Sequence, residues 1–194
     1  REVTAVELVE AVGSLDESWR GLSLTMPLKE VAFEVASTES ERAASAGAIN
    51  TLVRRADGGW DADNTDISGI VEALRPQLVA VDVVTVIGAG ATARSAILAA
   101  RELGAASLVV RARRPEAAQQ LAQWAADEVG FSSIGAGPIT TLTGREHLVI
   151  STVPPAAAEA VAAAIPAAAA YPASVLLDVV YANWPTPVAT VACE

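Results

Sequence analysis

Five polar side chains among the first 66 residues carry the functional groups of a small active site. Each is expected at the end of a strand or in the first turn of the following helix, and α/β domains gather their ligand sites at such places. One ammonium, one carboxylate, one amide and two hydroxyls suit a small polyhydroxylated acid, and the ammonium and carboxylate together could move a proton. The five residues are Ser23, Thr25, Lys29, Asn50 and Asp66.

The lysine of this cluster is expected at the start of a helix. Proline suits the first position of a helix, so Pro27 predicts a helix that begins there. Lys29 would then lie in the first turn, where its positive charge opposes the helix dipole and release of a proton is favoured. The alternative is an ordinary surface lysine.

A second candidate site follows residues 83–87, whose β-branched run is typical of a strand buried on both faces. The next six residues fit G-x-G-x-x-A, a pattern that joins a strand to a helix around a dinucleotide. The first glycine allows the tight turn, the second lets a pyrophosphate approach the backbone, and the alanine lets the helix pack close to the sheet. The alternative is a tight turn without a ligand. The residues of this turn are Gly88, Ala89, Gly90, Ala91, Thr92 and Ala93.

The end of the next expected strand, residues 107–112, bears on which nicotinamide cofactor is bound. An NAD site would place an acidic residue there to hold the ribose hydroxyls, but the chain has Arg111, Arg113 and Arg114. Guanidinium groups suit the 2′-phosphate of NADP. We assign Arg113 to it, whereas Arg111 and Arg114 could equally be solvated surface residues. Together with the polar cluster, an NADP site predicts reversible hydride transfer to a carbonyl.

The elements expected along the chain form two domains of the α/β class. Residues 1–76 predict a small α/β substrate-binding domain, with a capping box at residues 4–7, a hairpin turn at residues 57–58 and a helix that starts after Asn64. In residues 77–194 strands and helices alternate, which predicts a Rossmann-type, doubly wound parallel sheet that binds NADP. We expect the two domains to face each other across a cleft. Residues 138–144 have no clear pattern.

Composition excludes several classes of protein. The net charge of −10 disfavours nucleic acids and acidic membranes as partners, and no apolar run reaches the ~20 residues of a membrane span. A single cysteine, Cys193, excludes an internal disulfide and fits a reducing compartment, so we expect a cytoplasmic protein. The lone histidine, His147, excludes a histidine metal cluster, and we expect no metal.

Seven short motifs, in order along nearly the whole chain, resemble those of the shikimate dehydrogenase family. The family pattern G-x-N-V-T-x-P-x-K corresponds to GLSLTMPLK, G-A-x-N-T to GAINT, and N-T-D-x-x-G to NTDISG. The cofactor turn G-A-G-G-A-x-R corresponds to GAGATAR, N-R-T to ARR, N-T-T-P to STVP, and the closing D-x-x-Y-x-P-x-x-T-P to DVVYANWPTP.

The resemblance implies an NADP-dependent enzyme that reversibly reduces 3-dehydroshikimate to shikimate, on the way to chorismate and aromatic amino acids. It implies that Lys29 and Asp66 are the catalytic pair, with Lys29 as proton donor and acceptor. By the same resemblance Thr25, Asn50 and Tyr181 hold substrate hydroxyls, with Ser23 in place of the usual asparagine. The residues implied to hold NADP, besides those at 88–93, are Ala112, Arg113, Arg114, Thr152, Val153, Pro154 and Val179.

The chain departs from the family pattern at several places. Ala91 replaces a glycine and Ala112 replaces an asparagine beside the 2′-phosphate. The N-terminal S-x-S motif and the C-terminal glutamine of the family are absent, so we expect that both ends lack a piece. Two other functions stay open: a relative that acts on quinate or an aminated analogue, for which NAD is a possible cofactor, and a non-catalytic NADP-binding module. Shikimate and 3-dehydroshikimate are the expected small-molecule partners, and a homodimer is left open.

Overall fold

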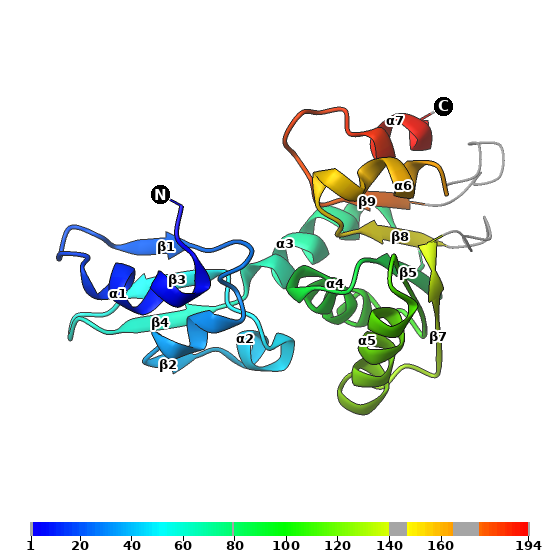
Figure 1. Ribbon diagram of the computed structural model, residues 1–194. Helices are drawn as coiled ribbons and strands as arrows, with labels where there is room; N and C mark the ends of the chain where they lie inside the picture. The colour runs from blue at the N-terminus through cyan, green and yellow to red at the C-terminus, as the bar shows by residue number, and fades with distance from the viewer. Residues whose placement is uncertain (1, 79, 140–146, 165–174, 194) are drawn as a thin grey trace. The chain divides into compact units, whose positions relative to one another are not determined.

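The computed structural model describes residues 2–78, 80–139, 147–164 and 175–193, and the chain divides into two compact units, residues 1–69 and 70–194 (Figure 1). Helix α3 (Thr65–Leu74) crosses this division. The expected domain boundary after residue 76 therefore stays a prediction. No helix in the described part of the chain is both long and apolar enough to cross a membrane.

The first unit contains a mixed four-stranded sheet in the order β1-β3-β4-β2. Its strands β1, β3 and β4 are antiparallel neighbours, and β2 pairs with β4 in parallel. The strands are β1 (Gly21–Ser23), β2 (Thr38–Glu39), β3 (Thr51–Arg54) and β4 (Trp60–Asp63). The helical elements before α3 are η1 (Ala5–Glu7), α1 (Leu8–Gly13), η2 (Val31–Glu34) and α2 (Glu41–Ala46).

Local sequence signals explain how these elements start and turn. The expected capping box is present, because Thr4 and Glu7 exchange hydrogen bonds at the start of η1. The turn between β3 and β4 passes through Gly58 at a φ of +88°, a conformation that favours glycine. Helix α3 begins directly after Asn64, as expected. A buried apolar core holds the unit together: Leu8, Val12, Leu24, Ala32, Ala43, Ile49, Leu52, Trp60 and Ala62.

The second unit contains a five-stranded parallel sheet in the order β7-β6-β5-β8-β9. The strand order reverses between β5 and β8, and open α/β sheets bind ligands outside the carboxyl ends of the strands at such a point. The Rossmann-type sheet expected from the sequence is therefore confirmed. Its strands are β5 (Val83–Ile87), β6 (Ser107–Ala112), β7 (Ser133–Pro138), β8 (Leu148–Ser151) and β9 (Val175–Asp178).

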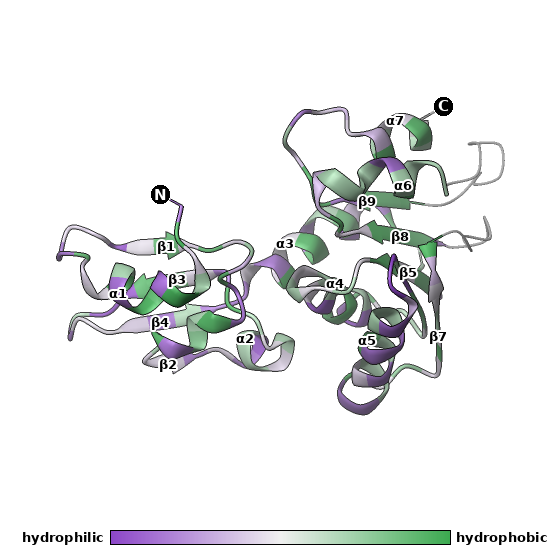
Figure 2. Ribbon diagram, viewed as in Figure 1, coloured by the Kyte–Doolittle hydropathy of each residue, from purple (hydrophilic) through white to green (hydrophobic). Residues whose placement is uncertain are grey.

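Helices cover both faces of this sheet (Figure 1). Helices α4 (Ala91–Glu102) and α5 (Pro115–Glu128) pack against β5, β6 and β7. On the other face, Ile87 and Val149 pack with Val161 and Val188 from α6 (Ala158–Ala162) and α7 (Pro187–Cys193). Burial on both sides explains why β5 and β8 are mainly hydrophobic, with Thr85 and Ser151 as their polar residues (Figure 2). The described part of the unit also contains two short 3₁₀ elements, η3 (Arg75–Gln77) and η5 (Pro155–Ala157).

Strand β7 was not expected from the sequence. It lies at the edge of the sheet, contains Gly135 and Gly137, and ends at Pro138. Glycine and proline are both depleted in strands, and proline is tolerated at an edge because its missing N–H need not pair. Most of the unpatterned segment at 138–144 lies outside the described residues.

Candidate active site and cofactor turn

Lys29 and Asp66 form an ion pair in the first unit. The Lys29 Nζ atom lies 2.6 Å from Asp66 Oδ2, and the two side chains are 12% and 23% exposed. A partly buried pair is less screened by water than a surface pair. Lys29 is also the only lysine in the 194-residue sequence, in which every other basic side chain apart from His147 is an arginine.

The helix expected at Pro27 is absent, and the helix-dipole explanation for Lys29 is therefore wrong. Residues 26–30 form turns, and the next helical element, η2, begins only at Val31. The physical reason is that backbone groups of this segment form hydrogen bonds with residues that are distant in the sequence. The Leu24 N–H donates to the Asn50 carbonyl and the Ile49 N–H donates to the Lys29 carbonyl, both at 2.7 Å. These two bonds hold Lys29 beside the segment that leads into β3.

Asp66 lies in the first turn of α3, where a negative charge complements the helix dipole. Its two carboxylate oxygens have different partners. Oδ2 accepts from Lys29, whereas Oδ1 accepts from Asn50 Nδ2 at 2.6 Å. The carboxylate therefore joins the ammonium to the amide, and the structure brings three of the predicted residues together.

Asn50 is only 8% exposed, and both ends of its amide are in use. Its Oδ1 atom accepts from the backbone N–H of Thr65 at 2.9 Å, which satisfies a donor in the first turn of α3. The hydroxyls of Thr51 and Thr65 lie 2.9 and 3.1 Å from the same oxygen. The two threonines had no expected role, although Thr51 belongs to the motif G-A-x-N-T and Thr65 to the motif N-T-D-x-x-G.

The remaining predicted substrate residues are exposed. Ser23 ends β1 and pairs in register with Thr51, and Thr25 follows two residues later. Their hydroxyls are therefore open to solvent on the same unit as the ion pair. Tyr181, in contrast, belongs to the second unit, where it is 90% exposed after β9.

The turn after β5 has the geometry that its glycines predicted. Gly88 has a φ of +124°, and a Cβ atom on it would lie 2.2 Å from Thr152 Oγ1. The Thr152 hydroxyl is fixed there because it donates to the Ile87 carbonyl at 2.9 Å. At Gly90 a Cβ atom would meet nothing within 4 Å, so this backbone faces open space, while Ala93, in the first turn of α4, is fully buried. A cradle of this kind at a helix start fits a pyrophosphate.

The other predicted cofactor residues lie around the carboxyl ends of β6, β8 and β9. Ala112 ends β6 and is buried, and the exposed Arg113 and Arg114 follow it. The Arg111 carbonyl accepts from the Gly88 N–H at 2.8 Å, which ties this strand end to the glycine turn. Val153 is buried and Pro154 is exposed after β8, and the half-buried Val179 donates its N–H to the Ser151 carbonyl at 3.1 Å. These positions fit a dinucleotide.

No group of three His, Cys, Asp or Glu side chains within the described ranges could hold a metal ion. His147 precedes β8, and its Nδ1 accepts from the Val83 N–H at 3.4 Å. Cys193 is the last residue of α7. The structure gives neither a role in the site.

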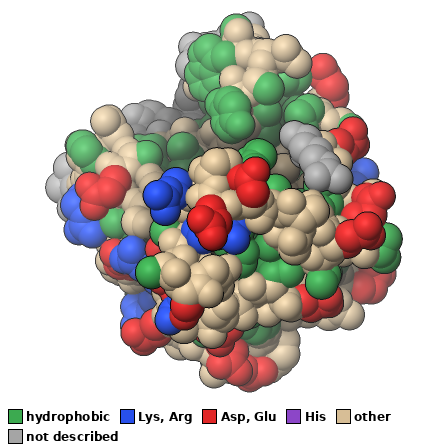
Figure 3. All heavy atoms as spheres, turned by 90° about the vertical axis from the view of Figure 1, so that its left-hand side faces the viewer, with side chains coloured by type: hydrophobic (Ala, Val, Ile, Leu, Met, Phe, Trp, Pro, Cys, Tyr) green, Lys and Arg blue, Asp and Glu red, His purple; other side chains and the backbone are tan. Residues whose placement is uncertain are grey.

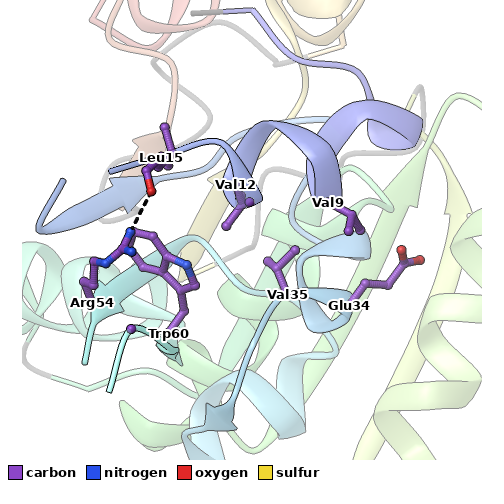
Figure 4. Close-up of a pocket in the computed structure, with 9 residues that line it drawn as sticks. Val9, Val12, Leu15, Glu34, Val35, Arg54 and Trp60 are labelled. Atoms are coloured by element: carbon purple, nitrogen blue, oxygen red, sulfur yellow. Dashed lines mark hydrogen bonds between the residues drawn. The ribbon is translucent and has the colours of Figure 1, made fainter. Parts of the chain in front are cut away.

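A separate hollow of about 290 Å³ lies at the other end of β3 and β4 (Figure 4). The Arg54 guanidinium stacks over the Trp60 ring at 5.0 Å and donates to the Leu15 carbonyl. None of the predicted substrate or cofactor residues lines it.

On the face of the molecule that Figure 3 shows, Lys and Arg side chains are scattered among acidic ones. This face therefore has no continuous basic surface for a nucleic acid.

Comparison with known proteins assigns the family. The family model for the shikimate dehydrogenase substrate binding domain matches residues 1–52. The shikimate dehydrogenase (NADP(+)) of Xanthomonas euvesicatoria pv. vesicatoria is 44% identical over 110 residues, which cover 55% of this chain and 38% of that protein. The crystal structure of Mycobacterium tuberculosis shikimate dehydrogenase is 34% identical, with a TM-score of 0.81, over 100% of this chain and 71% of that one. The chain belongs to the shikimate dehydrogenase family.

Two further structures of this family's fold carry ligands. Shikimate 5-dehydrogenase from Thermus thermophilus, in complex with NADP(H) and shikimate, is 26% identical with a TM-score of 0.78, over 98% of this chain and 70% of that one. Quinate dehydrogenase from Corynebacterium glutamicum, in complex with NAD, is 25% identical with a TM-score of 0.77, over 99% and 69%. The match to the Xanthomonas shikimate dehydrogenase covers less than half of that protein's length.

Proposed function

We propose that the protein is an NADP-dependent shikimate dehydrogenase that reversibly reduces 3-dehydroshikimate to shikimate. The observation that carries the proposal is the 2.6 Å ion pair between Lys29 and Asp66, in a chain of this family and on the unit that also carries the exposed Ser23 and Thr25. The pair offers a positioned proton donor on the unit that matches the substrate binding domain.

The chemistry needs a hydride and a proton. NADPH, when bound, supplies the hydride to the carbonyl carbon of the substrate. The carbonyl oxygen then gains negative charge, and the Lys29 ammonium stabilises that charge and donates the proton that makes the hydroxyl. In the oxidative direction the neutral amine takes the proton back. Asp66 holds the ammonium in place through its Oδ2 atom.

In this proposal, substrate hydroxyls are held by Thr25, Asn50 and Tyr181, with Ser23 in place of the usual asparagine. The cofactor is held by the turn at residues 88–93, with Arg113 on the 2′-phosphate and residues 152–154 and Val179 beside it. The cradle at Gly88 and Gly90 supports this assignment, because it combines a forced glycine conformation with an open backbone. Arg113 supports NADP because it is exposed directly after β6, where an NAD site would place an acidic residue.

A second candidate, oxidation of quinate with NAD, is favoured by the likeness to the Corynebacterium glutamicum quinate dehydrogenase. Both candidates are tested by steady-state kinetics of the full-length protein with shikimate or quinate and with NADP or NAD. We expect the highest kcat/KM for shikimate with NADP. A higher value for quinate with NAD would replace the proposal with the second candidate, and NADP binding without turnover would indicate a non-catalytic module.

A further inference from the structure

The side-chain amide of Asn50 bridges the helix start and the ion pair. It accepts a hydrogen bond from the Thr65 N–H and donates one to Asp66 Oδ1. The other carboxylate oxygen, Asp66 Oδ2, accepts from the Lys29 ammonium. We propose that Asn50 is a positioning residue that orients the Asp66 carboxylate and through it the Lys29 ammonium, with Thr51 and Thr65 fixing the direction of the amide. The inference rests on the proposed function of the Lys29–Asp66 pair.

The direction of the amide is set by its neighbours. An asparagine amide can be turned by half a rotation, which exchanges its oxygen and its nitrogen. The Thr65 backbone N–H can only donate, so the atom that faces it at 2.9 Å must be the oxygen. The NH₂ group must then face the Asp66 carboxylate, which can only accept when it is ionised.

The two threonine hydroxyls strengthen this choice. They lie 2.9 and 3.1 Å from Asn50 Oδ1 and 3.1 Å from each other. Each hydroxyl has one hydrogen, so if one threonine donates to the other, the second still donates to the amide oxygen. At least two hydrogen bonds therefore hold Oδ1. Because Asn50 is 8% exposed, water competes little for these bonds.

The consequence is a fixed proton donor. Because the Asn50 amide holds the Oδ1 atom of Asp66, rotation of the Asp66 carboxylate is restricted, and its Oδ2 atom stays 2.6 Å from the Lys29 ammonium. Proton transfer requires the donor within hydrogen-bond reach of the reacting atom, and a displacement of about 1 Å can cost roughly 10²-fold in rate. If the Asn50 amide is less firmly held, kcat should therefore fall more than substrate binding weakens.

The experiment replaces both threonine hydroxyls in the full-length protein. The variant Thr51→Val/Thr65→Val removes them at constant size, and Thr51→Ser/Thr65→Ser keeps them. Thr38→Val is the matched control, because the Thr38 hydroxyl also bonds a carboxylate of the first unit, that of Asp61, outside this network. We expect the valine pair to lower kcat for shikimate with NADP by about tenfold or more, with KM within about threefold, and the serine pair and control to match the parent protein.

A second readout is independent of activity. Because Lys29 is the only lysine among these 194 residues, ¹⁵N-lysine labelling of the 194-residue chain gives a single side-chain ammonium signal, whose visibility depends on slow hydrogen exchange in a hydrogen bond. We expect this signal to weaken in the valine pair and to persist in the serine pair and the control.

Three results would overturn the inference: an unchanged kcat and signal in the valine pair, a raised KM at normal kcat, or a serine pair as impaired as the valine pair. Should the parent protein lack activity, the proposed function fails, and the ammonium signal alone then supports or overturns the positioning role. If the valine pair loses the circular dichroism of the folded protein, the single variants Thr51→Val and Thr65→Val test the inference by the same kcat, KM and ammonium-signal measurements.

Discussion

The variant Gly88→Ala tests whether the turn after β5 demands glycine for the reasons that the structure gives. At a φ of +124° an alanine is disfavoured by about 1–2 kcal/mol. Its Cβ would also lie 2.2 Å from Thr152 Oγ1, and moving that hydroxyl breaks its bond to the Ile87 carbonyl, worth about 0.5–1.5 kcal/mol. The lower entropy of alanine in the unfolded chain offsets about 0.4–1 kcal/mol. We expect a net loss of about 0.5–3 kcal/mol.

Urea unfolding followed by circular dichroism measures this loss. Adding Thr152→Ala to Gly88→Ala should cost little further stability, because the displaced hydroxyl has already lost its bond to the Ile87 carbonyl and the clash disappears with it. Gly90→Ala is the matched control: its Cβ meets nothing within 4 Å, so stability should stay within about 1 kcal/mol, while NADP binding weakens. A stable Gly88→Ala protein, or a double variant much less stable than the single one, would refute the reasoning.

Three further predictions concern charged groups. Arg113→Ala should weaken binding of NADP by about 1.5–3 kcal/mol and of NAD far less, as measured by titration calorimetry; equal losses would remove the basis for an NADP site. Asp66→Asn should lower kcat and raise the substrate KM in steady-state assays, and unchanged values of both would contradict its role. The hydrogen bond from Arg55 lowers the pKa of the Asp57 carboxyl from its ordinary value of 3.8. The stability that this hydrogen bond adds is therefore present above pH 3.8 and is lost as the pH falls through the lowered pKa of the folded state. Urea midpoints of Arg55→Gln should therefore fall below those of the parent protein at neutral pH and converge with them in acid, and a gap that widened in acid would contradict this.

Local signals explain how much of the fold could be predicted. The capping box of Thr4, the turn at Gly58 and the start of α3 each depend on a few neighbouring residues, and the structure has all three. The alternation of apolar strands and helices after residue 80 likewise required a parallel sheet. Strand β7 escaped prediction because an edge strand with two glycines and a proline has little apolar pattern to detect.

The loop that carries Lys29 shows where such reasoning fails. Pro27 is a good first residue of a helix, but the backbone of Leu24 bonds that of residue 50 and the backbone of Lys29 bonds that of residue 49. Both partners lie far away in the sequence. Long-range pairing of this kind overrides a local propensity. The roles inferred here for Thr51 and Thr65 were hidden for the same reason, because only folding brings both hydroxyls onto one amide oxygen.

The central claim is that Lys29 delivers the proton, and the kinetics of Lys29→Met in the full-length protein test it most directly. The methionine keeps an unbranched side chain that is one heavy atom shorter, and it removes the ammonium that lies 2.6 Å from Asp66. Circular dichroism establishes that the variant is folded, and Thr38→Val serves as the control. We predict that kcat for shikimate with NADP falls by about 10²–10⁴-fold while the substrate KM changes modestly. A folded variant with near-normal kcat would contradict the account and assign the proton to another donor.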